Sequence, residues 1–211
     1  MKTLTKEDQD AITPEKAFTL LKEGNIRFIN NLKANRNLLQ QANETSDGQH
    51  PFAIILSCID SRTSAEIIFD QGLGDIFSVR IAGNIINEDI LGSMEFACKV
   101  AGAKIIVVLG HSKCGAIKGA CDHVEMGNLT VLLSKIRPAI DDENTILENR
   151  KSTNELFVDK VTLINVKRSM SGIVERSPIL KEMAERNEIK IIGGMHDLIS
   201  GEVTFTVNSY I

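Results

Sequence analysis

Two short runs of the sequence are almost entirely apolar, at residues 51–56 (PFAIIL) and 104–109 (KIIVVL). Each run is bounded by turn-forming or polar residues and has the length of a strand. A strand that is apolar on both faces is typical of a parallel sheet covered by helices on both sides. Further strands are predicted at residues 76–80, 189–192 and 203–207.

Helical patterns separate these strands. Thr13-Pro14-Glu15 has the residues of an N-cap, a first-turn proline and an acidic first turn, so it predicts an N-terminal helix. Ser177-Pro178 predicts the start of another helix, which ends near residue 187. Other helices are predicted at residues 64–70, 90–101, 116–125, 129–137 and 155–176. This alternation of strands and helices indicates an open α/β sheet with helices on both faces.

Two segments lack a clear period. Residues 33–50 are rich in Asn, Gln and small polar residues, which favours an irregular or weakly helical connection. Residues 141–155 are strongly charged and are predicted to lie exposed. Neither segment has the composition of a linker. We therefore predict one domain over residues 1–211, with an N-terminal helical arm at about 13–50 and a core at about 51–211.

Composition and charge argue against several classes of function. Hydrophobic residues make up 43% of the chain and charged residues 25%, the balance of a soluble globular protein. The net charge of -4, with no basic cluster beside aromatic residues, gives no support to nucleic-acid binding. The most apolar stretches are far shorter than the roughly 18 residues that a membrane span needs. The first residues lack the apolar core of a secretory signal, so a cytoplasmic location is expected unless a leader was removed.

The four cysteines of the chain do not have the pattern of a disulfide framework, and use as thiols or thiolates is expected. Cys98 and Cys121 lie in helical patterns without a partner motif, so they are predicted to be small core residues. His50 and His123 are predicted to lie at the surface.

Potential metal ligands follow the two most apolar strands. Cys58, Asp60 and Arg62 come after the first strand, and His111 and Cys114 come after the second. Sites in open α/β sheets form outside the carboxyl ends of the parallel strands. Residues i and i+2 of an extended segment share a face, so Cys58 and Asp60 can point into one cleft. Because two thiolates and one imidazole suit Zn²⁺, we predict a zinc site at Cys58, His111 and Cys114.

Asp60 decides which kind of zinc site this is. If Asp60 coordinates the metal, the site has four protein ligands and is closed. If Arg62 holds Asp60 in a charge-assisted pair, the fourth position is open to water, and Asp60 can orient a zinc-bound hydroxide. Sequence alone leaves both arrangements open.

Other motifs near these residues do not support a different site. The segment from Gly110 to Gly115 resembles a phosphate loop, but Ala116 and Ile117 stand where Lys and Ser/Thr are required. A dinucleotide fingerprint is also missing. A nucleophilic pair of Cys114 with a histidine would leave the C-x-D-x-R motif unexplained.

The assembled motifs resemble those of the beta-class carbonic anhydrases. The match consists of C-x-D-x-R at 58–62, R-x-A-G-N at 80–84 and H-x-x-C-G at 111–115. It extends over residues 15–207, including GN-x-R-F at 24–28 and GGMHDLISGEV near the C-terminus.

The resemblance implies an α/β fold with a mostly parallel central sheet of about five strands flanked by helices. It implies reversible hydration of carbon dioxide to bicarbonate and a proton. It assigns Cys58, His111 and Cys114 as ligands of Zn²⁺, with Asp60 and Arg62 as the dyad that orients the zinc-bound hydroxide. It also implies self-association as a homodimer or homotetramer, with the N-terminal helix reaching over the partner subunit.

The sequence departs from the family pattern at two positions. His196 stands where members often carry Tyr, which could alter a structural hydrogen bond or add a titrating group. Ile55 stands where some members have a Trp that belongs to a regulatory bicarbonate pocket, and the chain contains no Trp. That form of regulation is therefore not expected.

The sequence is also compatible with two alternative functions. The first is hydrolysis of a related linear molecule such as carbon disulfide, which close relatives of this fold perform with the same ligands. The second is a non-catalytic protein that binds zinc or bicarbonate. The expected mark of the second is loss of Asp60 or Arg62, and both are present.

Overall fold

The computed structural model describes residues 3–206. Its central sheet contains five strands: β1 (Ala53–Ser57), β2 (Ile76–Arg80), β3 (Ile105–His111), β4 (Lys190–His196) and β5 (Val203–Thr206). Their order is β2-β1-β3-β4-β5, and only the β4–β5 pair is antiparallel. This topology confirms the predicted α/β fold with a mostly parallel sheet.

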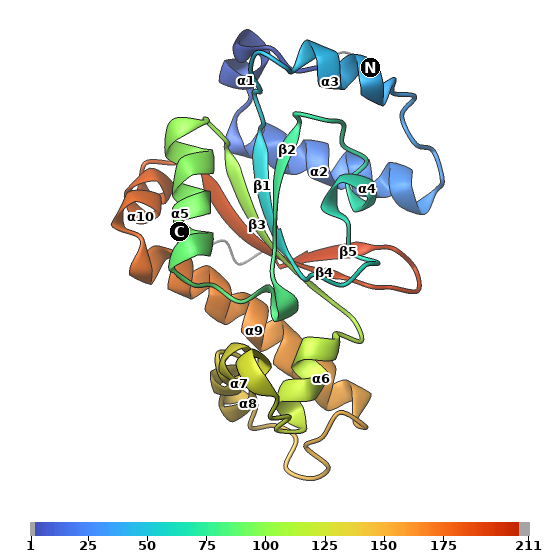
Figure 1. Ribbon diagram of the computed structural model, residues 1–211, viewed down its shortest axis with the longest axis vertical. Helices are drawn as coiled ribbons and strands as arrows, with labels where there is room; N and C mark the ends of the chain where they lie inside the picture. Colours follow the sequence, from blue (N-terminus) through green and yellow to red (C-terminus); the bar gives the residue numbers. More distant parts are fainter. Residues whose placement is uncertain (1–2, 207–211) are drawn as a thin grey trace.

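One face of the sheet is covered by the N-terminal part of the chain (Figure 1). This part contains α1 (Lys6–Ala11), α2 (Pro14–Ile29), α3 (Leu38–Glu44) and α4 (Ala65–Ile68). Ala17 and Leu21 of α2 pack with Ile55 and Phe69 in the core of this face. The helix therefore packs on its own sheet, and its predicted contact with a partner subunit stays a prediction.

The start of α2 is the predicted one, because the Thr13 side chain accepts a hydrogen bond from the Lys16 amide and Pro14 is the first helical residue. Helix α1 was not predicted from the sequence. Its signal is a capping box in which Thr5 and Asp8 bond each other's backbone amides.

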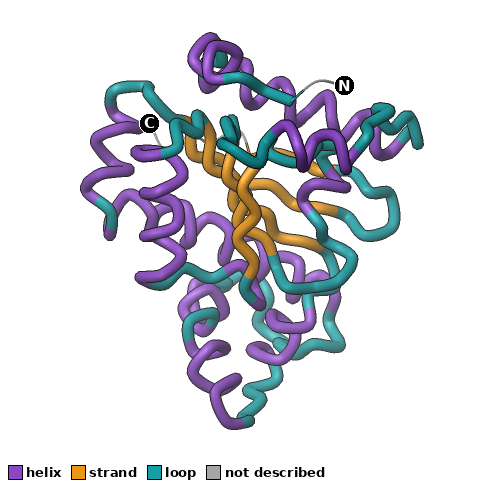
Figure 2. Tube along the Cα trace, turned by 45° about the horizontal axis from the view of Figure 1, so that its top comes forward, coloured by secondary structure: helices purple, strands orange, loops and turns teal. Residues whose placement is uncertain are grey.

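The other face carries α5 (Glu88–Glu95), α9 (Glu155–Arg176) and α10 (Pro178–Glu185). Figure 2 shows helices on both sides of the strands. Ile54 and Leu56 of β1 and Ile106 and Val108 of β3 point to this face, where they meet Met170 and other apolar residues. The two faces of each central strand are therefore both buried, as the continuous apolar runs predicted.

A lobe of three short helices lies beyond the carboxyl ends of the parallel strands, against part of α9 (Figure 1). It contains α6 (Gly115–Cys121), α7 (Gly127–Ser134) and α8 (Arg137–Asp142), and a short turn, η1 (Ala82–Asn84), packs beside it. Apolar side chains of this lobe and of α9 form a third buried cluster.

Several element bounds differ from the predictions. The predicted helix at 90–101 begins at Glu88, after an Asn87 cap, and its last turn is a π-helix, η2 (Phe96–Val100). Strand β4 continues four residues beyond the predicted 189–192. The predicted end of the last strand at residue 207 lies outside the described residues.

The charged segment at 141–155 is not exposed throughout. Glu143 is buried, and its carboxylate accepts hydrogen bonds from the amides of Thr145 and Ile146, each 2.9 Å long. These bonds offset the cost of burying the charge. Among residues 3–206, no helix is long and apolar enough to cross a membrane.

Candidate metal centre

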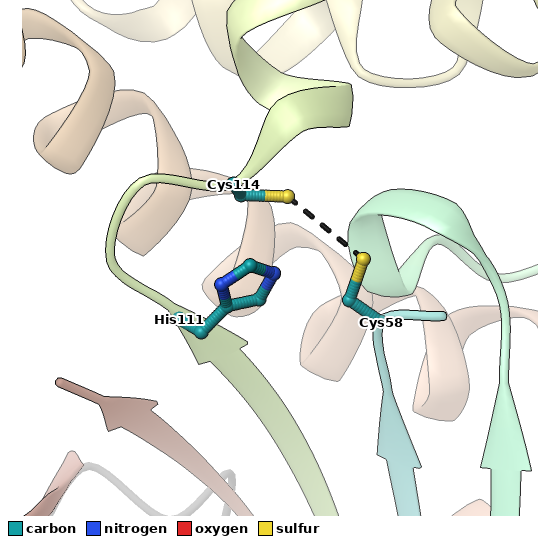
Figure 3. Close-up of side chains that lie close together, drawn as sticks. All are labelled: Cys58, His111 and Cys114. Carbon is teal, nitrogen blue, oxygen red and sulfur yellow. Dashed lines mark hydrogen bonds between the residues drawn. The ribbon is translucent and has the colours of Figure 1, made fainter. Parts of the chain in front are cut away.

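Cys58, His111 and Cys114 meet at the carboxyl edge of the sheet (Figure 3). Cys58 directly follows β1, His111 is the last residue of β3, and Cys114 is the N-cap of α6. Strands β1 and β3 are neighbours in the sheet, so their ends lie together. The three potential ligand atoms lie within 4.8 Å of one another, and all three residues are buried.

The turn from β3 into α6 brings His111 and Cys114 together. Lys113 adopts a left-handed backbone conformation, with φ of 57°, which turns the chain sharply between the two residues. The amide of Ser112 donates to the His196 carbonyl of β4, and the Leu198 amide donates to the Ser112 side chain. The turn is therefore fixed to the neighbouring strand.

One hydrogen bond determines the tautomer of His111. Its Nδ1 lies 2.9 Å from the carbonyl oxygen of Ser112, which can only accept, so Nδ1 carries the proton. The other nitrogen, Nε2, is buried and has no hydrogen-bond partner among the described residues. The free lone pair of Nε2 is therefore available to a metal.

The two sulfur atoms lie 4.0 Å apart and interact directly. The contact with Cys114 lowers the pKa of Cys58, and the amide of Gly83, 3.4 Å from the Cys58 sulfur, acts in the same direction. The same contact, together with burial, raises the pKa of Cys114. A bound metal cation would favour the thiolate form of both sulfurs, because metal ligands must be deprotonated.

This donor set fits Zn²⁺. At Zn–S distances of about 2.3 Å, a tetrahedral ion places two sulfur ligands about 3.8 Å apart, close to the observed 4.0 Å. Two thiol groups and one correctly protonated imidazole are the ligands that zinc prefers. Three protein ligands leave one position of a tetrahedron for another group.

Asp60 lies outside the group of three potential ligands and is paired with Arg62. Arg62 Nε and Nη2 donate to the two carboxylate oxygens over 2.9 and 2.7 Å, and the Arg62 amide adds a bond of 3.0 Å. These hydrogen bonds hold the pKa of Asp60 well below its usual range. Of the two arrangements left open by the sequence, the structure has Asp60 on Arg62.

His196 is buried beside the centre, opposite His111 in the pairing of β3 and β4. Neither of its ring nitrogens has a hydrogen-bond partner among residues 3–206. Burial, with a smaller contribution from His111, lowers the pKa of His196 to about 4, so the ring is neutral at pH 7. The His196 side chain therefore makes no hydrogen bond within the described residues.

The remaining cysteines and histidines lie outside the group. Cys98 and Cys121 are buried in apolar clusters, which confirms the prediction that they are core residues. His123 is exposed and His50 is half-buried.

The segment at 80–84 belongs to one of the sequence motifs, and the motif itself predicts no role for it. In the structure it borders Cys58: the Gly83 amide faces the Cys58 sulfur, and Arg80 donates to backbone carbonyls of the 58–62 turn. These contacts could not be predicted from the motifs, because they depend on where β2 ends beside β1.

Comparison with known proteins gives a consistent set of relatives. The family model described as carbonic anhydrase matches residues 53–203. Carbonic anhydrase 2 of Mycobacterium tuberculosis is 35% identical over 200 residues, which cover 89% of this chain and 90% of the relative. A carbonic anhydrase of Mycolicibacterium smegmatis is 34% identical over 197 residues, covering 90% of this chain and 92% of the relative.

Solved structures agree with this result. A beta-carbonic anhydrase of Aspergillus fumigatus has a TM-score of 0.71 at 27% identity, over 80% of this chain and 81% of the other. One of two tetrameric beta-carbonic anhydrases of Sordaria macrospora has a TM-score of 0.72 at 21% identity, over 80% of this chain and 87% of the other. The second likeness concerns the fold alone.

Proposed function

This chain belongs to the carbonic anhydrase family, in its beta class, and on that premise we propose that Cys58, His111 and Cys114 hold a Zn²⁺ ion with which it reversibly hydrates carbon dioxide. Carbonic anhydrase activity follows from the family. The identity of the metal, its ligands and the roles of Asp60 and Arg62 are the proposal.

The observation that carries the proposal is the state of His111. Its Nδ1 is committed to the Ser112 carbonyl, and its buried Nε2 has no partner among the described residues although two sulfurs lie close by. A buried polar atom without a partner is costly in a folded protein. A bound cation would remove this cost and would also stabilise the second thiolate.

When bound, zinc supplies a nucleophile near neutral pH by lowering the pKa of a water molecule, to about 7 in a carbonic anhydrase with three histidine ligands. In this chain, the Asp60 carboxylate is kept ionised by Arg62 and can only accept hydrogen bonds. We propose that it accepts a hydrogen bond from the attacking water and orients its lone pair toward carbon dioxide. Arg62 keeps Asp60 away from the metal position.

Removal and return of the metal test this proposal. A chelator should abolish carbon dioxide hydration, and added Zn²⁺ should restore it in proportion to occupancy, with a maximum near one ion per chain. Mg²⁺ is the control, because it prefers oxygen ligands and should not restore activity. Full hydration activity in a preparation free of metal would contradict the proposal.

The relatives described above are named carbonic anhydrases, which supports hydration over hydrolysis of carbon disulfide. The intact Asp60–Arg62 pair supports an enzyme over a non-catalytic zinc or bicarbonate-binding protein.

We also propose that the chain self-associates, as a homodimer or a homotetramer. Strand β2 forms an edge of the sheet, and the ring of Phe96 lies 6.3 Å from the ring of Phe77 in β2. Phe96 and Val100, both in η2, are 54% and 72% exposed. Exposed apolar groups beside an open strand edge favour contact with another chain. The tetrameric state named for the Sordaria macrospora enzymes supports the same proposal. Location in the cytoplasm stays a prediction from the sequence.

A further inference from the structure

We propose that Arg80 is a positioning residue of this centre, because its guanidinium group fixes the turn that carries both Cys58 and Asp60. This inference rests on the proposed zinc site. It assigns Arg80 no contact with the metal or with the substrate.

The turn needs such support because backbone pairing ends just before it. The parallel pairing of β1 with β2 ends at Ser57 and Arg80, and the Ile81 amide still donates to the Ser57 carbonyl over 3.0 Å. The chain after β2 then bends away through Gly83 and Asn84, whose φ angles are 69° and 41°. No further backbone pairing with β2 follows among the described residues of the turn.

Arg80 continues the connection with its side chain. Its Nε donates to the Cys58 carbonyl over 3.0 Å, and its Nη2 donates to the Asp60 carbonyl over 2.6 Å. These carbonyls belong to the two residues that supply a proposed metal ligand and the proposed orienting carboxylate. A guanidinium group suits this task, because it presents several donors in a rigid plane and stays charged.

Two arginines therefore hold Asp60 at different atoms. Arg62 binds the carboxylate, whereas Arg80 binds the backbone carbonyl of the same residue. The Thr63 hydroxyl lies 3.2 Å from the Cys58 carbonyl and 2.9 Å from the Asp60 carbonyl, but it has one proton and can donate to one of them at a time. The Thr63 amide also donates to the Asp60 carbonyl over 3.0 Å, so both carbonyls can keep a donor from Thr63 when Arg80 is lost. Loss of Arg80 nevertheless removes the side-chain hydrogen bonds that tie this turn to β2, which frees the turn to shift.

A shift of the turn would move the Cys58 sulfur and the Asp60 carboxylate together. We therefore expect Arg80→Met to weaken zinc binding about 10- to 100-fold, the usual effect of losing a group that orients a metal ligand. The visible absorption of the cobalt-loaded variant should also change, because that absorption reports the geometry of the ligands. A role in general stability alone would leave both quantities unchanged.

Arg150 offers a matched control. It also donates to backbone carbonyls, those of Ile140, Glu143 and Ile146, over 2.6 to 2.7 Å, but it holds the loop after α8. Arg150→Met should lower the melting temperature and leave zinc affinity and the cobalt spectrum as in the unmodified chain. The comparison separates positioning of the centre from loss of an arginine that holds a loop.

The experiment measures zinc affinity by competition with a chelator, and the cobalt spectrum, for the unmodified chain and for the variants Arg80→Met, Arg80→Lys and Arg150→Met. Arg80→Lys keeps the charge but replaces two separated donor nitrogens with one, so it should show a smaller loss of affinity; it carries the test if Arg80→Met does not fold. Zinc affinity within about twofold of the unmodified chain in the folded Arg80 variants, well below the expected loss, overturns the inference alone. An unmodified chain that binds no zinc overturns the proposed function and this inference together.

Discussion

At the scale of single residues, one hydrogen bond at His111 decides which of its nitrogens can bind a metal. The spacing of His111 and Cys114 after a buried strand predicts them as metal ligands. The sequence could not give the tautomer, because the position of the Ser112 carbonyl depends on contacts with β4. It also left the side chain of Asp60 open, since an aspartate two residues from a ligand can turn either to the metal or to Arg62.

Replacement of one thiol should remove the metal. We expect Cys114→Ser to lose zinc, because a hydroxyl group does not ionise near neutral pH and binds zinc poorly. The measurement is zinc content per chain after dialysis. Cys121→Ser is the matched control, because Cys121 is buried in the same apolar cluster but outside the ligand group, and it should keep its zinc. Equal zinc content in the two variants would contradict the ligand assignment.

Replacement of Asp60, the proposed orienting carboxylate, should leave the metal in place. Asp60→Asn is expected to lower kcat/KM for hydration about 10- to 100-fold, because an amide cannot act as an acceptor at both of its terminal atoms. Zinc content should not change. In the control Asp122→Asn, an aspartate that accepts hydrogen bonds from Ser152 is replaced at the surface, and turnover should stay the same. An unchanged kcat/KM in Asp60→Asn would contradict the proposed role of Asp60.

At the scale of elements, local signals gave most helix and strand positions. The long helix at 155–176 and the strand at 76–80 have the predicted bounds, because their caps and apolar pattern agree with their packing. The predicted β4 ends four residues too early, because two glycines lower the local preference of this segment for a strand. A Cβ atom on Gly193 would lie 2.5 Å from Thr206 Oγ1 and 2.7 Å from Val166 Cγ1, so close packing selects glycine there. Such a contact cannot be deduced from a local pattern.

A substitution at Gly24 tests the packing of α2 on α4. A Cβ atom at Gly24 would lie 1.8 Å from the carbonyl oxygen of Phe69, so backbone must move. Gly24→Ala should lower the free energy of unfolding by about 1–3 kcal/mol or more. In the control Gly92→Ala, on the exposed side of α5, nothing lies within 4 Å, and a gain of up to about 1 kcal/mol is expected. Urea denaturation measures both, and equal changes would contradict the described packing.

Asp70 joins the N-terminal arm to the loop after α4, and its contribution should depend on pH. Arg27 Nε and Arg36 Nη1 donate to its carboxylate over 2.5 and 2.6 Å. Burial acts to raise the pKa of Asp70, but the hydrogen bonds from Arg27, the Ala34 amide and Arg36 outweigh burial, so its pKa is lowered. Asp70→Asn should lower the free energy of unfolding at pH 7 by about 1.5–3 kcal/mol.

The sign of the pH dependence follows from the lowered pKa. A carboxyl group with a lower pKa in the folded than in the unfolded chain stabilises fully above its unfolded pKa, which is about 4. This stabilisation is lost as the pH falls further through the folded pKa. The difference between the unmodified chain and Asp70→Asn should therefore be constant from about pH 7 to 5 and shrink below about pH 4. A difference that grows on acidification would contradict the ion pairing.

At the scale of the whole molecule, the order of the strands assembles the centre. The proposed ligands come from segments more than fifty residues apart, and they meet because β1 and β3 are neighbours in one parallel sheet. The rule that sites form at the carboxyl edge located this centre from the sequence. That rule could not predict the contacts of Arg80, because they depend on how β2 is placed relative to the turn after β1.

Carbon dioxide hydration by the zinc-loaded chain is the most direct test of the central claim. Stopped-flow measurements should cover about pH 6 to 9, a range that brackets the pKa of water on zinc. The account predicts hydration above the uncatalysed rate within this range, in proportion to bound zinc. A chain that carries one zinc ion at this centre and hydrates no carbon dioxide at any pH in the range would contradict it.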